Sequence, residues 1–330
     1  MAIRIMGTGY YVPPKIVTND DLSKLMNTSD EWIQSRSGIR ERRMVDPTQT
    51  TSDLALVASQ NALLQAKLKP ENLECIVLAT VSPDHTFPGT GCFLQAKLGC
   101  HNIPAFDVHA QCSGFLYSLV VAKAMLDNGQ YQNALVVGAE IHSKGLDYSD
   151  AGRDIAVLFG DGAGAVVLSK DNTSAGIIDI EVGAEGAGAR DLWCEAPGVA
   201  FPKWDITDEM RQKRQNYPSM NGRRVFQMAT TKMESLARSM LAKHDLTEKD
   251  IALVICHQAN ARIIEFVRKS LGWKEEKFYI NMDRYANTTA ASIPLALSEA
   301  LERKVIGQGD KILLLAFGSG YTWGSCLLSL

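Results

Sequence analysis

The same order of apolar segments occurs twice along the amino-acid sequence. Residues 62–84 (ALLQAKLKPENLECIVLATVSPD) align with 239–261 (SMLAKHDLTEKDIALVICHQANA), and each is the end of a helix, an acidic turn and an apolar strand. A second pair, FLQAKLG at 93–99 and FVRKSLG at 266–272, follows at a similar spacing. Because order and spacing agree over roughly 90 residues, the sequence predicts a duplicated chain rather than two unrelated βαβ units.

Short apolar strands alternate with helical patterns along both halves. This alternation predicts an α/β fold whose sheets are covered on both faces. The turn-forming run SKDNTSAG lies where the halves meet. We therefore expect an N-terminal unit of residues 1–175 and a C-terminal unit of residues 176–330.

Composition narrows the classes of partner. The 330-residue chain has a formal net charge of −3, which gives no global reason to expect nucleic acid. Its 7 cysteines are scattered without CxxC pairs, which argues against a disulfide framework or a zinc site and fits a reducing compartment. No secretory leader and no apolar run of membrane-spanning length are visible, so we expect a cytoplasmic protein without a membrane partner.

Three candidate catalytic residues follow predicted strands and are expected to converge, because ligands in such sheets collect at strand ends. Cys112 begins an apolar helix in HAQCSGFLYS, where the helix dipole is expected to lower its thiol pKa. His257 follows the strand IALVIC, and Asn287 precedes an apolar helix in NTTAAS. Taken singly, each has an ordinary structural explanation: a packed thiol, a satisfied histidine and a helix cap.

Together these residues form a Cys/His/Asn set that is compatible with two mechanisms. In a papain-like site the histidine deprotonates the thiol and asparagine orients the ring. In the alternative, the helix start ionises the thiol, while His257 and Asn287 donate hydrogen bonds to a second substrate, as carbon–carbon bond formation requires. The glycine-rich turn GSGYTWG (318–324) could add a backbone N–H to an oxyanion site beside the N–H of Cys112.

Several separated motifs resemble the β-ketoacyl-acyl-carrier-protein synthase III family of the thiolase superfamily. They are GTGYYVP, TSDEWIQSRSGIRERR, FDVHAQCSGF, FGDGAGAVVLS, HQAN, NTTAASIP and AFGSGYTWGS, in the family's order over almost the whole chain. The resemblance implies a thiolase-like duplicated fold of five layers, α-β-α-β-α, that forms a homodimer. It also implies that an acyl-CoA primer is condensed with malonyl-acyl carrier protein, with release of CO2, at the start of fatty acid synthesis. No cofactor is expected beyond the coenzyme A thioester substrate, and no metal.

The resemblance also assigns roles to single residues. Cys112 would be the acylated nucleophile, with His257 and Asn287 binding the malonyl thioester and stabilising its enolate. Backbone N–H groups of Cys112 and Ser319 would hold the oxyanion of acyl transfer. The remaining residues implied by the motifs are Trp32, Arg36 and Arg153 at coenzyme A, Phe87 at the partner's acyl pocket, and Arg262, Arg268 and Lys269 at the acyl carrier protein.

Two departures from the family pattern leave alternatives open. Ala286 stands where the family usually has glycine before the catalytic asparagine, and the loop at 193–226 is longer and richer in charge than in short-loop members. The loop leaves room for a specialised condensing enzyme of the long-chain, polyketide or quinolone type. A cysteine thioester hydrolase and a non-catalytic paralogue are rivals of other classes.

Overall fold

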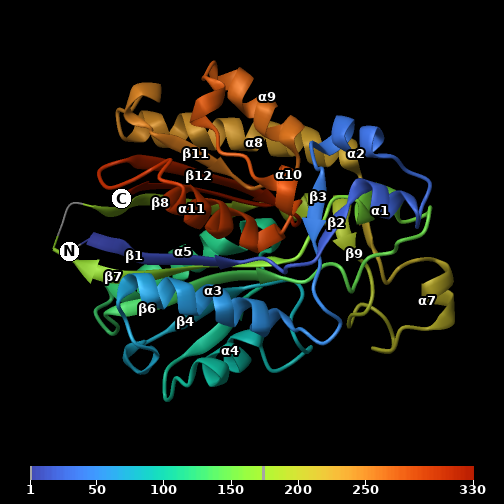
Figure 1. Cartoon of the computed structure of the whole chain (residues 1–330), viewed down its shortest axis with the longest axis horizontal. Helices are drawn as coiled ribbons and strands as arrows, with labels where there is room; N and C mark the ends of the chain where they lie inside the picture. The colour runs from blue at the N-terminus through green and yellow to red at the C-terminus, as the bar shows by residue number, and fades with distance from the viewer. Residues whose placement is uncertain (1, 173–174) are drawn as a thin grey trace.

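Two large β-sheets form the centre of the protein in the computed structural model, which describes residues 2–172 and 175–330 (Figure 1). The first sheet has the strand order β1-β7-β6-β4-β5. Its strands are β1 (Ala2–Tyr11), β4 (Ile76–Ala79), β5 (Ala105–Val108), β6 (Asn133–Glu140) and β7 (Gly162–Asp171). Strand β4 runs parallel to both β5 and β6, whereas β7 is antiparallel to β6 and β1.

The second sheet repeats this arrangement in the order β11-β12-β13-β8. Its strands are β8 (Gly176–Ala184), β11 (Leu253–Cys256), β12 (Lys311–Gly318) and β13 (Thr322–Ser329). One parallel pair is followed by two antiparallel pairs, as in β4-β6-β7-β1. The counterpart of β5 is only an isolated bridge between Val254 and Phe278. The duplication predicted from the sequence is thus present in the strand topology.

Helices complete five layers, α-β-α-β-α, which confirms the expected fold class (Figure 1). Helices α3 (Thr51–Ala66) and α4 (Thr90–Leu98) cover the outer face of the first sheet. Helices α5 (Gly114–Asp127) and α11 (Ser292–Glu302) lie between the sheets. The outer face of the second sheet is covered by α8 (Gly222–Lys243), and α9 (Ala261–Leu271) packs beside α8.

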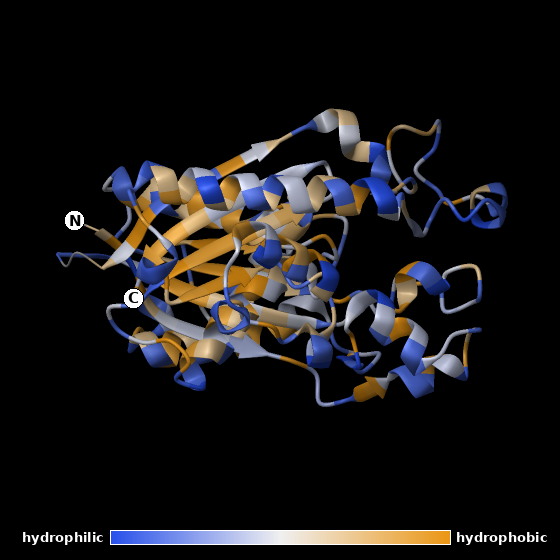
Figure 2. Cartoon of the chain, turned by 90° about the horizontal axis from the view of Figure 1, so that it is seen from above, coloured by the Kyte–Doolittle hydropathy of each residue, from blue (hydrophilic) through white to orange (hydrophobic). Residues whose placement is uncertain are grey.

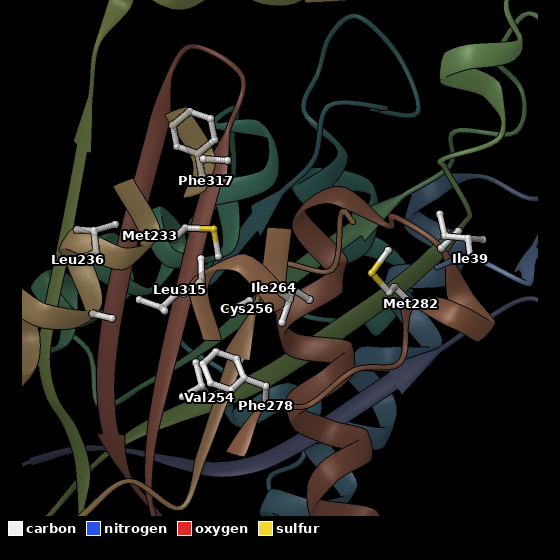
Figure 3. Close-up of a cluster of buried hydrophobic side chains, with 14 of the residues drawn as sticks. Ile39, Met233, Leu236, Val254, Cys256, Ile264, Phe278, Met282, Leu315 and Phe317 are labelled. Atoms are coloured by element: carbon white, nitrogen blue, oxygen red, sulfur yellow. The ribbon is translucent and has the colours of Figure 1, made fainter. Parts of the chain in front are cut away.

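The hydrophobic pattern of each helix matches its layer. Every residue of α11 from Ser292 to Ala300 is buried, as expected for a helix enclosed between two sheets. Helix α8 instead buries one face, including Met233, Leu236 and Met240, and keeps polar residues on the other. Figure 2 shows the resulting contrast between apolar central strands and mixed outer helices. Figure 3 shows Met233 and Leu236 of α8 in the cluster of buried side chains that includes Leu315 and Phe317 of β12.

The remaining short elements lie at the ends of the sheets, around the site described below. They are β2 (Ile16–Thr18), α1 (Asn19–Ser23), α2 (Asp30–Ser37), β3 (Glu41–Arg43), α6 (Arg153–Ala156), β9 (Leu192–Cys194), α7 (Asp208–Gln212), β10 (Pro218–Met220) and α10 (Met282–Tyr285). Strands β9 and β10 pair with each other, and the chain between them carries α7 away from the layers (Figure 1). Among the described residues, none of the helices has both the length and the apolar character that crossing a bilayer requires.

We propose the division into residues 1–175 and 176–330 as two structural halves. It is supported by the origin of the strands, because the first large sheet is built from residues 2–171 and the second from residues 176–329. The central layer joins the halves, since α5 also contacts β8 and β13 while α11 also contacts β1 and β7.

Candidate active site

Cys112 lies in a single 3-10 turn, Gln111–Ser113, between the end of β5 and the start of α5. Its residue surface is 9% exposed. The end of β12 approaches this turn closely: a Cβ atom on Gly318 would lie 3.0 Å from both the Cβ and the backbone nitrogen of Cys112. A side chain at this position would be tighter than an ordinary van der Waals contact, so glycine allows the 318–322 turn of the second half to lie directly against Cys112 of the first.

The environment of the Cys112 thiol opposes its ionisation. Burial raises the pKa of Cys112 to about 12, and the nearby carboxylate of Glu140 acts in the same direction. Hydrogen bonds from the backbone of Cys112 and Ser319 act in the opposite direction and favour the thiolate. The pKa lowering expected from the helix start is therefore wrong for the free protein, because burial outweighs it.

His257 follows β11 and is held in a fixed orientation. Its backbone N–H donates to Leu315 O at 2.7 Å, and its Nδ1 lies 2.7 Å from Ser292 Oγ. Gln258 N–H also donates to Ser292 Oγ, at 3.4 Å, which leaves the hydroxyl proton free to bond Nδ1 and favours the tautomer with a proton on Nε2. Burial lowers the pKa of His257 to about 3, so the ring is neutral near pH 7.

The Nε2 atom of His257 is buried and has no hydrogen-bond partner among the described residues. The thiol of Cys112 is therefore not hydrogen-bonded to it, and a papain-like ion pair is not formed. An unpaired buried N–H is costly unless a substrate atom satisfies it. The ring is consequently arranged as a donor toward a ligand rather than as a base on the thiol.

Asn287 is fixed at both its backbone and its side chain. Its N–H donates to Leu158 O at 2.9 Å, and its carbonyl accepts from Gly160 N–H at 3.1 Å. The side-chain Oδ1 accepts from Thr289 N–H at 2.8 Å, so the amide Nδ2 remains as the donor available to a ligand.

 His257 and Asn287, which both come from the second half, therefore each present an N–H group to a ligand.

Ala286, directly before Asn287, adopts φ 56° and ψ −158°, a backbone conformation that is almost restricted to glycine. Its methyl group is buried. We expect Ala286→Gly to raise the free energy of unfolding by about 1 kcal/mol, since the relieved strain exceeds the entropy that glycine loses on folding. Chemical denaturation measures this change. Ala290→Gly is the matched control, because Ala290 does not have a positive φ, and it is expected to destabilise. A destabilised Ala286→Gly variant would contradict the strain.

One cavity of about 440 Å³ brings the three candidate residues together, since Cys112, His257 and Asn287 all line it. Its other walls come from α8, α9 and the end of β12, with apolar side chains such as Phe226, Met233 and Phe317. Ser319, whose backbone hydrogen-bonds the thiol, lines it as well. Within the described ranges, no group of three or more His, Cys, Asp or Glu side chains is arranged to hold a metal ion.

A second cavity, of about 700 Å³, is also lined by Cys112. Cys112, Phe159, Leu192 and Ser319 line both cavities, so the thiol lies at their junction. The first cavity is called the arm chamber below, after the coenzyme A or carrier-protein arm that the family resemblance implies there, and the second the acyl chamber, after the acyl chain of the primer.

Comparison with known proteins identifies the family. The chain is 47% identical over 328 residues to β-ketoacyl-[acyl-carrier-protein] synthase III of Caldanaerobacter subterraneus subsp. tengcongensis, covering 99% of this chain and 98% of that relative. The chain belongs to the β-ketoacyl-[acyl-carrier-protein] synthase III family. The synthase III of Clostridium acetobutylicum is 44% identical over 327 residues, with 99% and 98% covered. Family models for 3-oxoacyl-[acyl-carrier-protein] synthase III and its C-terminal part match residues 106–186 and 241–330.

A solved structure of the same family gives the same result for the fold. The crystal structure of 3-oxoacyl-[acyl-carrier-protein] synthase III from Aquifex aeolicus VF5 superposes with a TM-score of 0.90 at 40% identity, covering 99% of this chain and 100% of that one. The full-length synthase III matches favour the synthase over the specialised condensing enzyme that the long 193–226 loop left open.

The three residues expected at coenzyme A lie together outside the arm chamber. The guanidinium carbons of Arg36 and Arg153 are 4.3 Å and 4.6 Å from the centre of the Trp32 ring. Asn260 lines the arm chamber, and its side-chain amide donates to Arg36 O at 3.0 Å. This bond connects the cluster of Trp32 and the two arginines to the chamber. Both guanidinium groups thus lie within cation–π distance of the indole ring.

The other residues implied by the family are distributed over the surface. Phe87 is 83% exposed. Arg262 is exposed and lines the arm chamber, whereas Arg268 makes two hydrogen bonds to Glu265 and one to Trp273 O. Lys269 pairs with the same Glu265 at 3.0 Å. The Arg268 side chain is thus fixed by hydrogen bonds within the chain. Of the three basic residues on α9, only Arg262 lines the arm chamber.

Two residues at the site were missed from the sequence. Ser292 positions the His257 ring. In the sequence it is one polar residue at the start of an apolar helix, and nothing there indicates a contact with His257. Glu140 is fully buried and accepts hydrogen bonds from Ser82 Oγ, Thr80 Oγ1 and Val81 N–H. Burial raises its pKa to about 7. A single acid ending the otherwise apolar run NALVVGA could have indicated it.

Proposed function

We propose that the protein is a β-ketoacyl-acyl-carrier-protein synthase III that condenses an acyl-CoA primer with malonyl-acyl carrier protein and thereby initiates fatty acid synthesis. The observation that carries the proposal is the arm chamber, in which one thiol faces two neutral N–H donors. A thiol suits acyl transfer and paired donors suit an enolate, so the cavity fits a two-step condensation.

In the first step, Cys112 sulfur attacks the thioester carbonyl of the primer. The new carbon–sulfur bond forms, the bond to the coenzyme A sulfur breaks, and the thiol proton of Cys112 ends on the departing coenzyme A. Backbone N–H groups of Cys112 and Ser319 hold the oxyanion of the tetrahedral intermediate, a role supported by their hydrogen bonds to the sulfur.

In the second step, the malonyl thioester loses CO2 and leaves an enolate, whose oxygen accepts hydrogen bonds from His257 Nε2–H and Asn287 Nδ2–H. The enolate carbon then attacks the acyl carbonyl on Cys112 and forms the new carbon–carbon bond, while the bond to sulfur breaks and Cys112 leaves as a thiolate that takes up a proton from water. Neutral donors are suited to this step because they stabilise charge that appears only as the reaction proceeds. The lowered pKa of His257 keeps the ring in that neutral form.

The partners follow from the same proposal. Trp32, Arg36 and Arg153 bind the adenine end of coenzyme A, and Arg262 with neighbouring Lys269 contributes to docking of the acidic carrier protein. The family resemblance implies a homodimer, and Phe87, which is 83% exposed in the single chain, is the side chain proposed to reach the partner's acyl pocket. The proposed enzyme is cytoplasmic and uses no resident cofactor, with coenzyme A entering only as the substrate thioester.

The test is to supply a panel of acyl-CoA primers with malonyl-acyl carrier protein or malonyl-CoA and to identify products by mass spectrometry. A condensing enzyme releases a β-ketoacyl product two carbons longer than the primer, together with CO2 derived from a 13C label in the free carboxyl of malonate. Free acid of unchanged length, without labelled CO2, would instead establish the cysteine hydrolase. No product of either kind would support the non-catalytic paralogue.

A further inference from the structure

The walls of the acyl chamber contain more polar side chains than an alkyl group requires. His109, Gln111, His142, Asn216 and Thr289 all line it. They come from separate parts of the chain, so their presence in one cavity is a product of the fold. Burying polar groups against an alkyl chain is unfavourable unless each group has a hydrogen-bond partner.

His142 and Thr289 supply a fixed donor and acceptor to the chamber. His142 Nε2 lies 2.7 Å from Thr289 Oγ1. In either tautomer of the ring this bond uses one proton and one lone pair, and the pair keeps one further donor and one further acceptor. Burial lowers the pKa of His142 to about 4, so the pair is neutral near pH 7.

Asn216 supplies an acceptor that the protein itself does not satisfy. Its Oδ1 is buried and has no hydrogen-bond partner among the described residues. A buried carboxamide oxygen without a partner is rare and disfavoured in a folded protein. In a ligand cavity, such an atom indicates that a bound group donates a hydrogen bond to it.

Charge narrows the class of ligand. The residues that line the acyl chamber, all within the described part of the chain, include no Asp, Glu, Lys or Arg. The arm chamber, by contrast, has Arg223 and Arg262 in its lining. An acyl group with a terminal carboxylate would therefore lose its hydration in the acyl chamber without meeting a cation.

We propose that the acyl chamber selects a primer whose acyl chain carries a hydroxyl group. A hydroxyl both donates and accepts, so it satisfies either the unpaired oxygen of Asn216 or the His142–Thr289 pair, whereas a ketone only accepts. This inference rests on the proposed function, because it takes the acyl chamber as the place of the chain attached to Cys112. Within a single chain the cavity measures about 700 Å³.

The experiment measures how fast Cys112 is acylated, by intact mass, with matched pairs of primers and no malonyl donor. The pairs are butyryl-CoA with 3-hydroxybutyryl-CoA, and hexanoyl-CoA with 6-hydroxyhexanoyl-CoA, which sample a near and a far hydroxyl. We expect the hydroxylated member to react at least about 10-fold faster in at least one pair, because a site built for a hydroxyl rejects the analogue that lacks it.

Two variants and one control locate the effect. His142→Leu and Asn216→Leu are expected to reduce the ratio of hydroxylated to alkyl acylation by about 10-fold or to reverse it. Gln215→Leu makes the same polar-to-apolar change beside Asn216 at a residue that does not line the chamber, and its ratio should equal that of the wild type. Circular dichroism confirms folding, and the ratio within one variant cancels any general loss of activity.

The outcomes separate this inference from the proposed function. Alkyl primers that react as fast as their hydroxylated partners in both pairs would overturn the hydroxyl preference while leaving the synthase intact. A preference that survives in both leucine variants would also overturn it. Absence of a Cys112 adduct with every acyl-CoA would overturn the proposed function, and the inference with it.

Discussion

Incubation with an acyl-CoA in the absence of a malonyl donor is expected to leave a stable thioester on Cys112, seen as a mass increase equal to the acyl group. The expectation rests on the position of this thiol at the junction of two cavities, with backbone N–H groups of Cys112 and Ser319 directed at the sulfur. Cys112→Ala should abolish the adduct and reduce condensation by at least about 10³-fold, because the covalent route is lost.

A matched control is available in the same cavity. Cys194 also lines the acyl chamber, and its residue is exposed, although partial burial raises the pKa of its thiol. Cys194→Ser should retain the adduct. Peptide mapping that places the acyl group on Cys194, or an adduct that persists in Cys112→Ala, would refute the assignment of the nucleophile.

His257→Ala is expected to retain acylation of Cys112 but to reduce malonyl decarboxylation by about 10²–10³-fold, the effect of losing one donor to a developing oxyanion. The reason is geometric: His257 Nε2 is buried, has no partner among the described residues and lines the cavity that Cys112 and Asn287 share. Release of 13CO2 from labelled malonyl-CoA, measured beside intact-mass acylation, separates the two steps.

Substitution and pH distinguish a donor from a base. His257→Asn still offers an N–H group and should decarboxylate faster than His257→Ala. Because burial lowers the pKa of His257 to about 3, its ring stays neutral between pH 8 and pH 5, and decarboxylation should show no loss attributable to imidazole protonation in that range. Loss of acylation in His257→Ala would instead show that the histidine acts as a base on the thiol.

The sequence predicted the architecture of the sheets well because duplication is visible as a repeated order of segments. Pairing 62–84 with 239–261 placed β4 opposite β11, and the structure gives these strands equivalent positions in the two sheets. Their burial could be predicted for the same reason, since continuous apolar runs have to be covered on both faces. The five layers came from the family resemblance, because periodicity does not specify which faces meet.

The electrostatics of the site could not be read in the same way. A helix start beside Cys112 is visible in the sequence, and it suggested a lowered thiol pKa. Glu140, 28 positions away along the chain, and the depth of burial are set by tertiary packing, and both raise that pKa. His142 and Asn216 line the acyl chamber from distant segments, so its polarity was equally invisible before the fold was known.

The junction at Cys112 has a consequence for the order of events in each catalytic cycle. In the proposed reaction, the arm chamber is used twice, first by the coenzyme A that delivers the primer and then by the acyl carrier protein that delivers malonate. The outgoing coenzyme A has to leave before the next arm enters. In that scheme, excess acyl-CoA is expected to occupy the arm chamber of an already acylated enzyme and to slow the condensation step.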